Sequence, residues 1–474
     1  MNGPLPVAVI GGGPVGLAAA AELAERGLPF VLLERGPAVA DAVRQWSHVR
    51  LFSPWRWNVA AAAERLLATA GWTAPDPDAI PTGGDIVTRY LEPLAALPAL
   101  APHIRTGTTV TAISRAGRDK LTDAGREAAP FRLRLGTADG RSETLLARAV
   151  IDASGTWGSP NPMGLDGLPV DGEDAARAAG RLTAGIPDVL ADPGYADART
   201  LVVGGGHSAM NVVLDLLRLR ERAPGTRITW ALRHDRPQKV QGGGLNDKLP
   251  ARGDLGRRAL QAIEDGRVTM LAPFSTDRIT PAGDGLAVEG TQGPESVRLD
   301  VDRIVVATGF RPDLSMLREV RVALDPAVEA PPALAPLIDP NLHSCGTVRP
   351  HGARELCHPE PGFYVVGMKS YGRAPTFLMA TGYEQVRSVV AALDGDHAAA
   401  DDVRLVLPET GVCSAPAVAA AGDDGCCGGP APVEADACCR ADAEAKAAGE
   451  EGCGCGTTRE PVPAVADACC GASA

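Results

Sequence analysis

The sequence predicts an α/β protein with two parallel-sheet domains, the second inserted in the first, and a disordered, Cys-rich C-terminal tail. Three observations carry this prediction. A short buried strand, a Gly-rich turn and an apolar-faced helix occur twice in the same order. Each unit later closes on an apolar strand that ends in a Gly turn. After about Ala398 the chain becomes rich in Ala, Gly, Pro, Asp and Glu without periodicity, which is typical of disorder.

The first unit begins at the N-terminus. Val7–Ile10 is expected to be a buried strand, residues 11–16 a turn, Val15–Arg26 a helix and Phe30–Glu34 the second strand. The remaining strands expected for this unit are 131–135, 143–147 and 149–152, followed by a Gly turn at 153–155.

The second unit repeats the plan. Its strand 201–203 leads into the turn 204–209, a helix to about Arg220 and a return strand 227–232. The later strands are expected at 268–271, 286–289, 297–301 and 304–306, with a closing turn at 307–309. A strand at 363–367 and a helix at 375–393 would complete the first sheet. The predicted boundaries are 1–160 for the first part of domain one, 195–325 for domain two, 326–398 for the completing part and 399–474 for the tail.

Composition narrows the functional classes. The chain has 474 residues, 45% of them hydrophobic and only 4% aromatic, with a formal net charge of −12. From Asp401 onward, 13 Asp and Glu oppose 4 Lys and Arg, so the body is nearly neutral. We therefore expect neither nucleic acid nor an anionic membrane as a partner. The N-terminal apolar run has no basic region before it and is soon broken by glycines, which favours a cytoplasmic protein. A homodimer stays open.

The first Gly-rich turn fits a pyrophosphate. Gly11 would make the tight turn, Gly13 would let backbone amides approach the phosphates, and Gly16 would pack helix on strand. Pro14 opens the helix whose N-terminus attracts the anion. Glu34 ends the next strand and would accept hydrogen bonds from the ribose hydroxyls.

The second turn repeats the device, with Gly204 and Gly206 followed by Ala209. His207 and Ser208 open its helix and are expected near the cofactor, although a Ser at a helix start is also a common cap. Arg233 stands where an NAD-binding domain has an acid. A cation there accommodates a 2′-phosphate, so NADPH is favoured over NADH. The alternative for Arg233 is a solvated residue at a strand end.

With these motifs the chain resembles the two-dinucleotide-binding-domain flavoproteins, and within them the flavin-containing monooxygenase-like branch, over roughly 6–393. The resemblance implies FAD on the first unit and NADPH on the second. It also implies cofactor-contacting turns at Ser154 and Gly155 and at Thr308 and Gly309, and we add Gly367, at the end of the 363–367 strand.

The branch is less sharply defined. Disulfide reductases of this architecture need a Cys pair beside the flavin, and the body has only Cys345 and Cys357, 12 residues apart. Class B monooxygenases carry a Phe-x-Gly-x-x-x-His signature before the second loop, and 160–200 contains no His. The stretches 46–55, 338–351 and 368–377 resemble the flavin monooxygenases of actinobacterial arsenic-resistance operons, several of which end in a Cys-rich tail.

Four residues are candidate catalytic groups. His48 and Arg50 follow the first unit closely enough to reach the flavin ring, as do Ser53, Trp55 and Trp57. A reduced flavin develops negative charge, which a cation stabilises. Arg50, Lys369 and Arg373 are the candidates for that cation. The alternative is that the tryptophans belong to the core and Arg50 to a surface ion pair.

Cysteines suggest two soft-metal sites. Cys345 and Cys357 lie among His343, His351 and His358, which could hold a thiophilic ion or simply be buried. The tail holds nine of the 11 cysteines. Close thiolates on a flexible acidic chain could bind a thiophilic metal or metalloid ion, against the alternative of an inert tail. The metal candidates in the tail are Cys426, Cys427, Cys438, Cys439, Cys453, Cys455, Cys469 and Cys470.

Together these features predict an FAD- and NADPH-dependent oxidoreductase of monooxygenase type, acting on a small molecule and linked to arsenic or heavy-metal resistance. One alternative is a reductase that passes electrons to thiols, disulfides or quinones through the tail. Another is a metal buffer or sensor in which the flavin is only structural, although a buffer needs no hydride source.

Overall fold

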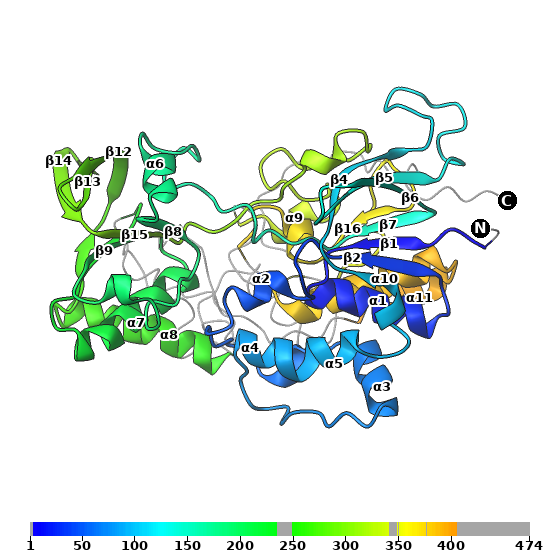
Figure 1. Cartoon of the computed structure of the whole chain (residues 1–474), viewed down its shortest axis with the longest axis horizontal. Helices are drawn as coiled ribbons and strands as arrows, with labels where there is room; N and C mark the ends of the chain where they lie inside the picture. Colours follow the sequence, from blue (N-terminus) through cyan, green and yellow to red (C-terminus); the bar gives the residue numbers. More distant parts are fainter. Residues whose placement is uncertain (1–2, 235–248, 341–347, 349, 376, 405–474) are drawn as a thin grey trace, which may run out of the picture.

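The computed structural model describes residues 3–234, 249–340, 348, 350–375 and 377–404, and Figure 1 shows two α/β domains side by side. The first domain is built on a parallel sheet in the order β16-β7-β1-β2-β3. Its strands are β16 (Phe363–Val365), β7 (Ala149–Asp152), β1 (Val7–Ile10), β2 (Phe30–Leu33) and β3 (Ile104–Arg105).

This sheet separates two cores. In β1, Val7 and Val9 pack with the helices α1 (Pro14–Glu25) and α10 (Met379–Leu393). Ala8 and Ile10 point to the opposite face and pack against an antiparallel sheet. The sheet consists of β4 (Thr108–Arg115), β5 (Phe131–Thr137) and β6 (Ser142–Ala147). Alternate side chains of one buried strand therefore serve two cores, as expected for a parallel strand covered on both faces.

The second domain repeats these layers. Its parallel sheet has the order β11-β10-β9-β15-β8. The helices α7 (His207–Arg222) and α8 (Pro250–Glu264) share a core on one face, and an antiparallel sheet and α6 (Glu173–Ala178) share a core on the other. Its strands are β8 (Leu182–Ala184), β9 (Arg199–Val203), β10 (Arg227–Ala231), β11 (Thr269–Leu271), β12 (Phe274–Ala282), β13 (Gly285–Gln292), β14 (Glu295–Val301) and β15 (Arg303–Val306).

A helical segment between β2 and β3 covers the first domain. It packs on α1 and lies below the sheet in Figure 1. Its elements are α2 (Asp41–Arg44), a 3-10 turn (Trp55–Trp57), α3 (Ala61–Thr69), α4 (Gly83–Ile86), a π-helical turn (Val87–Leu91), α5 (Glu92–Ala95) and a 3-10 turn (Ala101–His103). The other short elements are the 3-10 turns Pro193–Tyr195, Ser315–Leu317 and Gly367–Tyr371, with α9 (Ala335–Ile338) and α11 (His397–Asp401).

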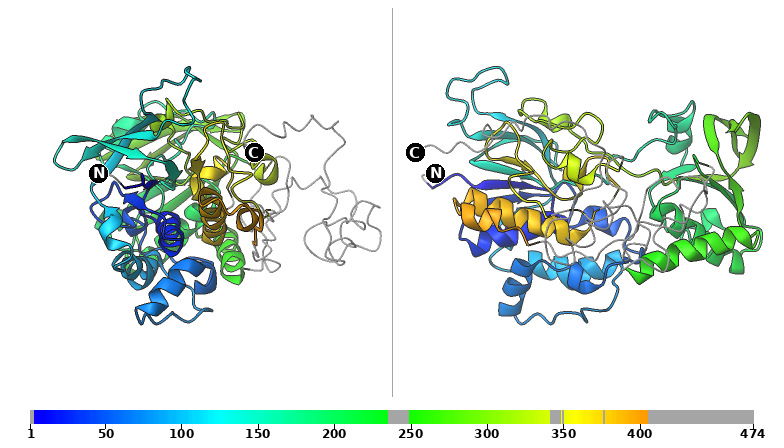
Figure 2. Two further views of the ribbon diagram at one scale, coloured as in Figure 1. Left: turned by 90° about the vertical axis from the view of Figure 1, so that its right-hand side faces the viewer. Right: turned by 180° about the vertical axis from the view of Figure 1, so that it is seen from behind.

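The predicted fold class is confirmed, and the second domain is inserted between β7 and β16. The chain crosses between the domains twice, and the two crossings pair. Asn161 N–H donates to Gly309 O at 2.9 Å, and Arg311 N–H donates to Ser159 O at 2.9 Å. The Trp157 ring stacks on Phe310 at the same place, with ring centroids 4.8 Å apart. Figure 2 shows the domains from two further sides.

The domain limits differ in detail from the predicted ones. β8 and α6 precede the predicted start at 195 and belong to the second domain, whereas the 3-10 turn Ser315–Leu317 packs on β4 of the first. The predicted boundary at 398/399 falls inside α11, which packs on α10. The predicted disordered tail lies almost entirely outside the described residues. Among the described residues, no helix is long and apolar enough to span a membrane.

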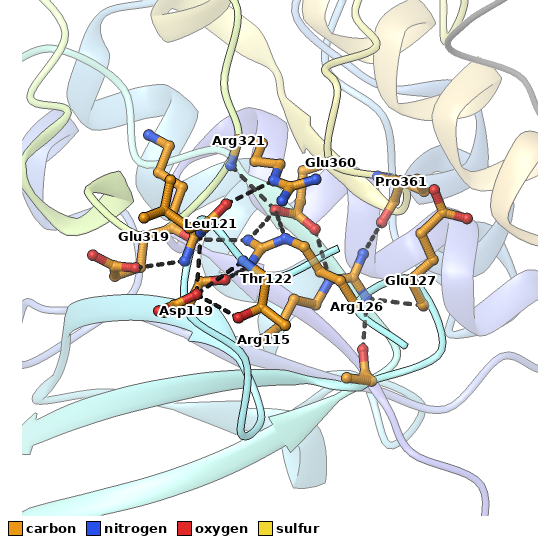
Figure 3. A network of polar contacts seen from close by, with 12 residues as sticks. Arg115, Asp119, Leu121, Thr122, Arg126, Glu127, Glu319, Arg321, Glu360 and Pro361 are labelled. Atoms are coloured by element: carbon orange, nitrogen blue, oxygen red, sulfur yellow. Dashed lines mark hydrogen bonds and ion pairs between the residues drawn. The ribbon is translucent and has the colours of Figure 1, made fainter. Parts of the chain in front are cut away.

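A buried ionic network ties the top of the first domain together (Figure 3). Glu360 Oε1 accepts a hydrogen bond from Arg115 Nε at 2.8 Å, and Glu360 Oε2 is paired with Arg126. All three side chains are at most 3% exposed. Arg126 also donates to the carbonyl oxygen of Glu319. The network thereby joins the β4–β5 loop to the two segments that follow the second domain.

Candidate cofactor and substrate sites

The first Gly-rich loop has the geometry that close packing requires. Gly11 has φ +99°, and a Cβ there would lie 2.7 Å from Ala153 O. A Cβ on Gly16 would lie 1.9 Å from Gly11 O, so no side chain fits. At Gly13, by contrast, a Cβ would meet no protein atom within 4 Å. The loop is therefore crowded toward β7 and open at Gly13, where the fingerprint places the pyrophosphate.

The helix after this loop begins without a side-chain cap. Gly13 is its N-cap and Pro14 its first residue, and no side chain accepts from the first-turn amides. Unpaired N–H groups at a helix N-terminus attract anions, and α1 spans 12 residues. The helix start therefore fits a phosphate group.

Glu34 lies just after β2 and is 9% exposed. Its Oε2 accepts from Gly12 N–H at 2.6 Å and its Oε1 from Gly36 N–H at 2.6 Å. A carboxylate has about four lone-pair positions, so two stay available for ribose hydroxyls. The same carboxylate thus holds the Gly-rich loop in place and fits the predicted ribose contact.

Lys369 forms a buried ion pair at the end of β7. Its Nζ lies 2.7 Å from Asp152 Oδ2 and donates to Ser154 Oγ at 3.0 Å, and both charged side chains are at most 1% exposed. Ser154 Oγ in turn donates to Asp152 Oδ1 at 2.6 Å. Ser154 itself is exposed, and Gly155 follows with φ +66°. Lys369 thus holds in place, through Ser154 Oγ, the turn that is predicted to contact FAD. Asp152 was missed, although an acid inside an apolar strand is a visible signal.

Gly367 lies against the start of α1. Its φ is +70°, and a Cβ there would lie 3.2 Å from Val15 Cγ2. Its N–H donates to Gln385 Oε1 at 2.7 Å, and Gln385 Nε2 donates to Ser370 Oγ at 3.0 Å. Gln385, fully buried on α10, was also missed, because nothing in the sequence links it to a position 18 residues earlier.

The second loop has similar geometry. Gly204 has φ +127°, and a Cβ there would lie 2.3 Å from Ala307 O. A Cβ at Gly206 would meet nothing within 4 Å, and Gly206 caps α7 without a side-chain bond. His207 and Ser208 are the first two residues of that helix, so Ser208 is not the cap. Ala209 is fully buried, as its packing role requires.

Two further predicted residues flank this loop. Thr308 Oγ1 donates to Asn161 O at 2.9 Å, and Gly309 has φ +91°, so both shape the crossing between domains. Arg233 lies two residues beyond β10 and is exposed. This position at the carboxyl end of the second parallel strand is where a 2′-phosphate would be recognised.

The remaining candidate residues lie in different environments. His48 and Arg50 line a cavity of about 450 Å³ together with α7 and α8. Ser53 Oγ donates to Asn58 Oδ1 at 2.9 Å, and Trp55 is 2% exposed in the core. Arg373 is exposed, and its N–H donates to Val328 O at 2.7 Å.

The predicted thiol sites fall mostly outside the described residues, which exclude His343, Cys345 and all eight metal candidates of the tail. Within the described ranges, no group of three or more His, Cys, Asp and Glu side chains could hold a metal ion. His351 Nε2 lies 3.0 Å from Gln385 Nε2, and His358 Nδ1 lies 3.1 Å from Ala323 O. Burial lowers the pKa of His358 to about 4, so its ring is neutral at pH 7.

Comparison with known proteins agrees with this geometry. The curated relatives include an indole-3-pyruvate monooxygenase (YUCCA1) of Oryza sativa subsp. japonica, 32% identical over 214 residues, which are 44% of each chain. Another is an indole-3-pyruvate monooxygenase (YUCCA8) of Oryza sativa subsp. indica, 36% identical over 109 residues, 23% of this chain and 24% of the relative. The chain thus covers less than half of the length of these relatives.

Solved structures share the fold. The bacillithiol disulfide reductase of Bacillus cereus is 18% identical, with a TM-score of 0.61 over 83% of this chain and 99% of that one. The ornithine N-hydroxylase of Kutzneria sp. 744, solved with reduced FAD, NADP⁺ and L-ornithine, is 18% identical, with a TM-score of 0.54 over 83% of this chain and 100% of that one. The family model described as pyridine nucleotide-disulphide oxidoreductase matches residues 8–335, more than half of the chain. The chain therefore belongs to the pyridine nucleotide-disulphide oxidoreductase family.

Proposed function

We propose that the protein is a monooxygenase-type flavoenzyme in which NADPH reduces FAD and molecular oxygen is the electron acceptor. The observation that carries this proposal is the combination of two open, uncapped dinucleotide loops with a body that contains no closely spaced Cys pair. A dithiol relay needs two neighbouring thiols, and the body has only Cys345 and Cys357. The monooxygenases among the relatives favour the same reading.

The residues would divide the work between the two loops. The start of α1 with Gly11, Gly13 and Gly16 would hold the FAD pyrophosphate, and Glu34 the ribose. The start of α7 would hold the NADPH pyrophosphate, and Arg233 the 2′-phosphate. Bound FAD supplies hydride acceptance and oxygen activation, while the protein supplies orientation and electrostatics.

Among the three candidate cations, we propose Lys369 as the positioning residue of the flavin site. Its ion pair with Asp152 is shielded from water, and its Nζ holds the Ser154 hydroxyl in place. Arg373 is exposed and Arg50 lines a separate cavity, so neither has a comparable link to a predicted cofactor turn. His48 lines the same cavity as Arg50, so any catalytic role for it would be exerted on a molecule bound there.

We further propose that the enzyme serves arsenic or heavy-metal resistance and that its thiol-rich tail binds the ion. This rests on the sequence resemblance of 46–55, 338–351 and 368–377 and on the nine tail cysteines. A second candidate function is a reductase that passes electrons through the tail. It is favoured by the adjacent Cys pairs at 426–427, 438–439 and 469–470.

Stopped-flow spectroscopy tests the electron acceptor. The purified protein is reduced with NADPH without oxygen and then mixed with air-saturated buffer. A monooxygenase is expected to pass through a spectrum distinct from both the reduced and the oxidised flavin before the oxidised band returns. Direct return of the oxidised band, together with NADPH-dependent reduction of a disulfide or a quinone, would refute the proposal and favour the tail-dependent reductase.

A further inference from the structure

The cavity between the two domains has features that the dinucleotide sites do not explain. Its volume is about 450 Å³, within the usual range for small-molecule sites. One wall is the 48–52 segment of the first domain, and the opposite wall comes from α7 and α8 of the second. No residue of either Gly-rich loop lines it. It is therefore a pocket at a domain interface, where ligand sites are common.

The cavity adjoins the start of α7 without being part of the second loop. The Phe52 ring, in one wall, lies 5.1 Å from the His207 ring, centroid to centroid. Asn211, in the other wall, donates from Nδ2 to His207 O at 3.0 Å. One end of the cavity is thus a single helical turn from the residues that would hold NADPH. A molecule bound there would lie close to the start of α7, where the NADPH pyrophosphate would bind.

Its walls carry more positive than negative charge. Arg50, Arg218 and Arg258 oppose Asp215 and Asp254. Burial raises the pKa of Asp215. Its nearest cation is Arg218, at 3.1 Å.

Arg50 and Arg258 are the least compensated of these cations. Asp254 is already paired with Arg257, and Arg258 NH1 lies 4.0 Å from it. Arg50 NH1 donates to the Ile80 carbonyl oxygen, and among the described residues no carboxylate pairs with Arg50 within 4 Å. Two guanidinium groups in the lining are therefore left for an anion.

His48 adds an unsatisfied group. It lines the cavity, and its Nε2 is buried with no hydrogen-bond partner among the described residues. A buried nitrogen without a partner costs free energy, and because Nε2 is closed off from the cavity, a ligand could pair with it only after the imidazole ring rotates. Phe52, Leu214 and Leu255 add apolar surface beside the charged groups.

We propose that this cavity is the substrate site of the flavoenzyme and that it takes a small molecule with a carboxylate or similar oxyanion head and a short apolar body. Arg258 and Arg50 would pair with the oxyanion, and His48 would form part of the wall beside it. Phe52, Leu214 and Leu255 would contact the apolar body. Calling the ligand a substrate rests on the proposed function, whereas the predicted binding does not depend on turnover.

Calorimetry on the full-length FAD-bound protein tests it. The probes are 3-phenylpropanoate and its uncharged amide, which differ only in the head group. We expect the carboxylate to bind more tightly than the amide, also with saturating NADP⁺ present. Arg258→Gln should weaken carboxylate binding by about tenfold or more, the loss of one charge-assisted hydrogen bond. The amide should change by less than about twofold.

Arg220→Gln is the matched control. Arg220 lies on α7 outside the cavity lining and donates to Arg267 O at 2.8 Å. Arg220→Gln should leave the affinities for the carboxylate and for the amide unchanged. Equal binding of the two probes, an equal loss in both variants, or displacement by NADP⁺ would each overturn the cavity assignment. The protein could instead bind the carboxylate as expected while NADPH fails to reduce its flavin. That result would refute the proposed function but not the anion site.

Discussion

At the residue scale, substitutions at Gly13 and Gly16 should have different effects, the first on FAD binding and the second on folding. We expect Gly13→Asp to fold and to lose FAD, because a Cβ at Gly13 meets no protein atom within 4 Å while its carboxylate would repel the pyrophosphate. Gly16→Ala should fail to fold stably, since its Cβ would lie 1.9 Å from Gly11 O. The measurements are flavin absorbance per chain and the melting temperature relative to FAD-stripped native protein. Normal flavin content in Gly13→Asp would contradict the site assignment.

Lys369 and Asp152 should behave as one unit. Removing one member of a buried ion pair leaves an uncompensated charge and costs about 3 to 5 kcal/mol, whereas removing both is far less costly. Lys369→Met should therefore destabilise the protein strongly, and Lys369→Met with Asp152→Asn should recover much of the loss. Urea unfolding of the native protein, Lys369→Met, Asp152→Asn and the double variant measures the coupling free energy between the two side chains. Additive effects would mean that the 2.7 Å contact contributes little.

Arg233 should set the preference for NADPH. Its exposed side chain at the end of β10 would pair with the 2′-phosphate, which NADH lacks. We expect NADPH to reduce the flavin faster than NADH, and Arg233→Ala to narrow that difference mainly through a weaker apparent affinity for NADPH. Equal rates with both nucleotides in the native protein would contradict the assignment.

The residues that the sequence predicted are those with a local signal. The glycines, Glu34 and Arg233 each stand at a fixed offset from a predicted strand, so spacing alone makes them candidates for cofactor binding. Asp152, Gln385 and the cavity residue Arg258 have no such offset. Gln385 acts on Gly367 from another element, and Arg258 faces His48 only because the two domains are in contact. Their roles depend on tertiary packing.

At the scale of elements, Glu360 should control how the β4–β5 loop is held. Burial alone would raise the pKa of Glu360, but hydrogen bonds from Arg126 and Arg115 outweigh it and keep the pKa below its usual range. Stability from this group is therefore present above the unfolded pKa, near 4.3, and is lost as pH falls through the lower folded value. Glu360→Gln leaves two buried guanidinium groups uncompensated and should cost about 3 to 5 kcal/mol at pH 7.

Glu143→Gln is the control for this network. Glu143 pairs with Arg105 at 2.6 Å, but both side chains are more than a third exposed. Exposed pairs contribute about 1 kcal/mol or less. Urea unfolding between pH 7 and about pH 3, a range that passes through the unfolded pKa and continues below it, should show a reduced acid sensitivity for Glu360→Gln and an unchanged one for Glu143→Gln. Equal losses in the two variants would mean that burial does not strengthen the Glu360 pairs.

Elements with strong periodicity were predictable, and irregular ones were not. The strands predicted at 7–10 and 149–152 have the observed ends, and the one predicted at 304–306 begins one residue earlier, at Arg303, because continuous apolar runs between Gly turns define buried parallel strands. The helical elements at 61–69 and 83–95 were missed. In the second stretch a π-helical turn at 87–91 interrupts the helical period and leaves α4 and α5 with four residues each. α8 was missed because Gly253 and Gly256 weaken its helical pattern.

At the scale of the whole molecule, the described part of the chain reaches Arg404. It includes both parallel sheets and α11, whose Ala400 is 5% exposed. Ser388 Oγ donates to Ala400 O at 2.6 Å, and Arg404 N–H donates to Glu384 Oε1 at 2.7 Å. The packed part of the chain therefore extends at least to Arg404, beyond the composition change at Ala398. Nine of the 11 cysteines lie after it.

Truncation after Arg404 should therefore leave the melting temperature, FAD content and NADPH-dependent flavin reduction intact while removing most binding of arsenite, because a chelating dithiol holds a soft ion far better than an isolated thiol. Truncation after Ala399 is the matched control and should lower the melting temperature by removing buried Ala400 and its hydrogen bond to Ser388. Arsenite titrations of full-length and truncated protein measure stoichiometry and affinity. Unchanged arsenite binding after truncation would move the site to Cys345 and Cys357. Loss of turnover with normal flavin reduction would instead identify the tail as an electron relay and favour the reductase over the monooxygenase.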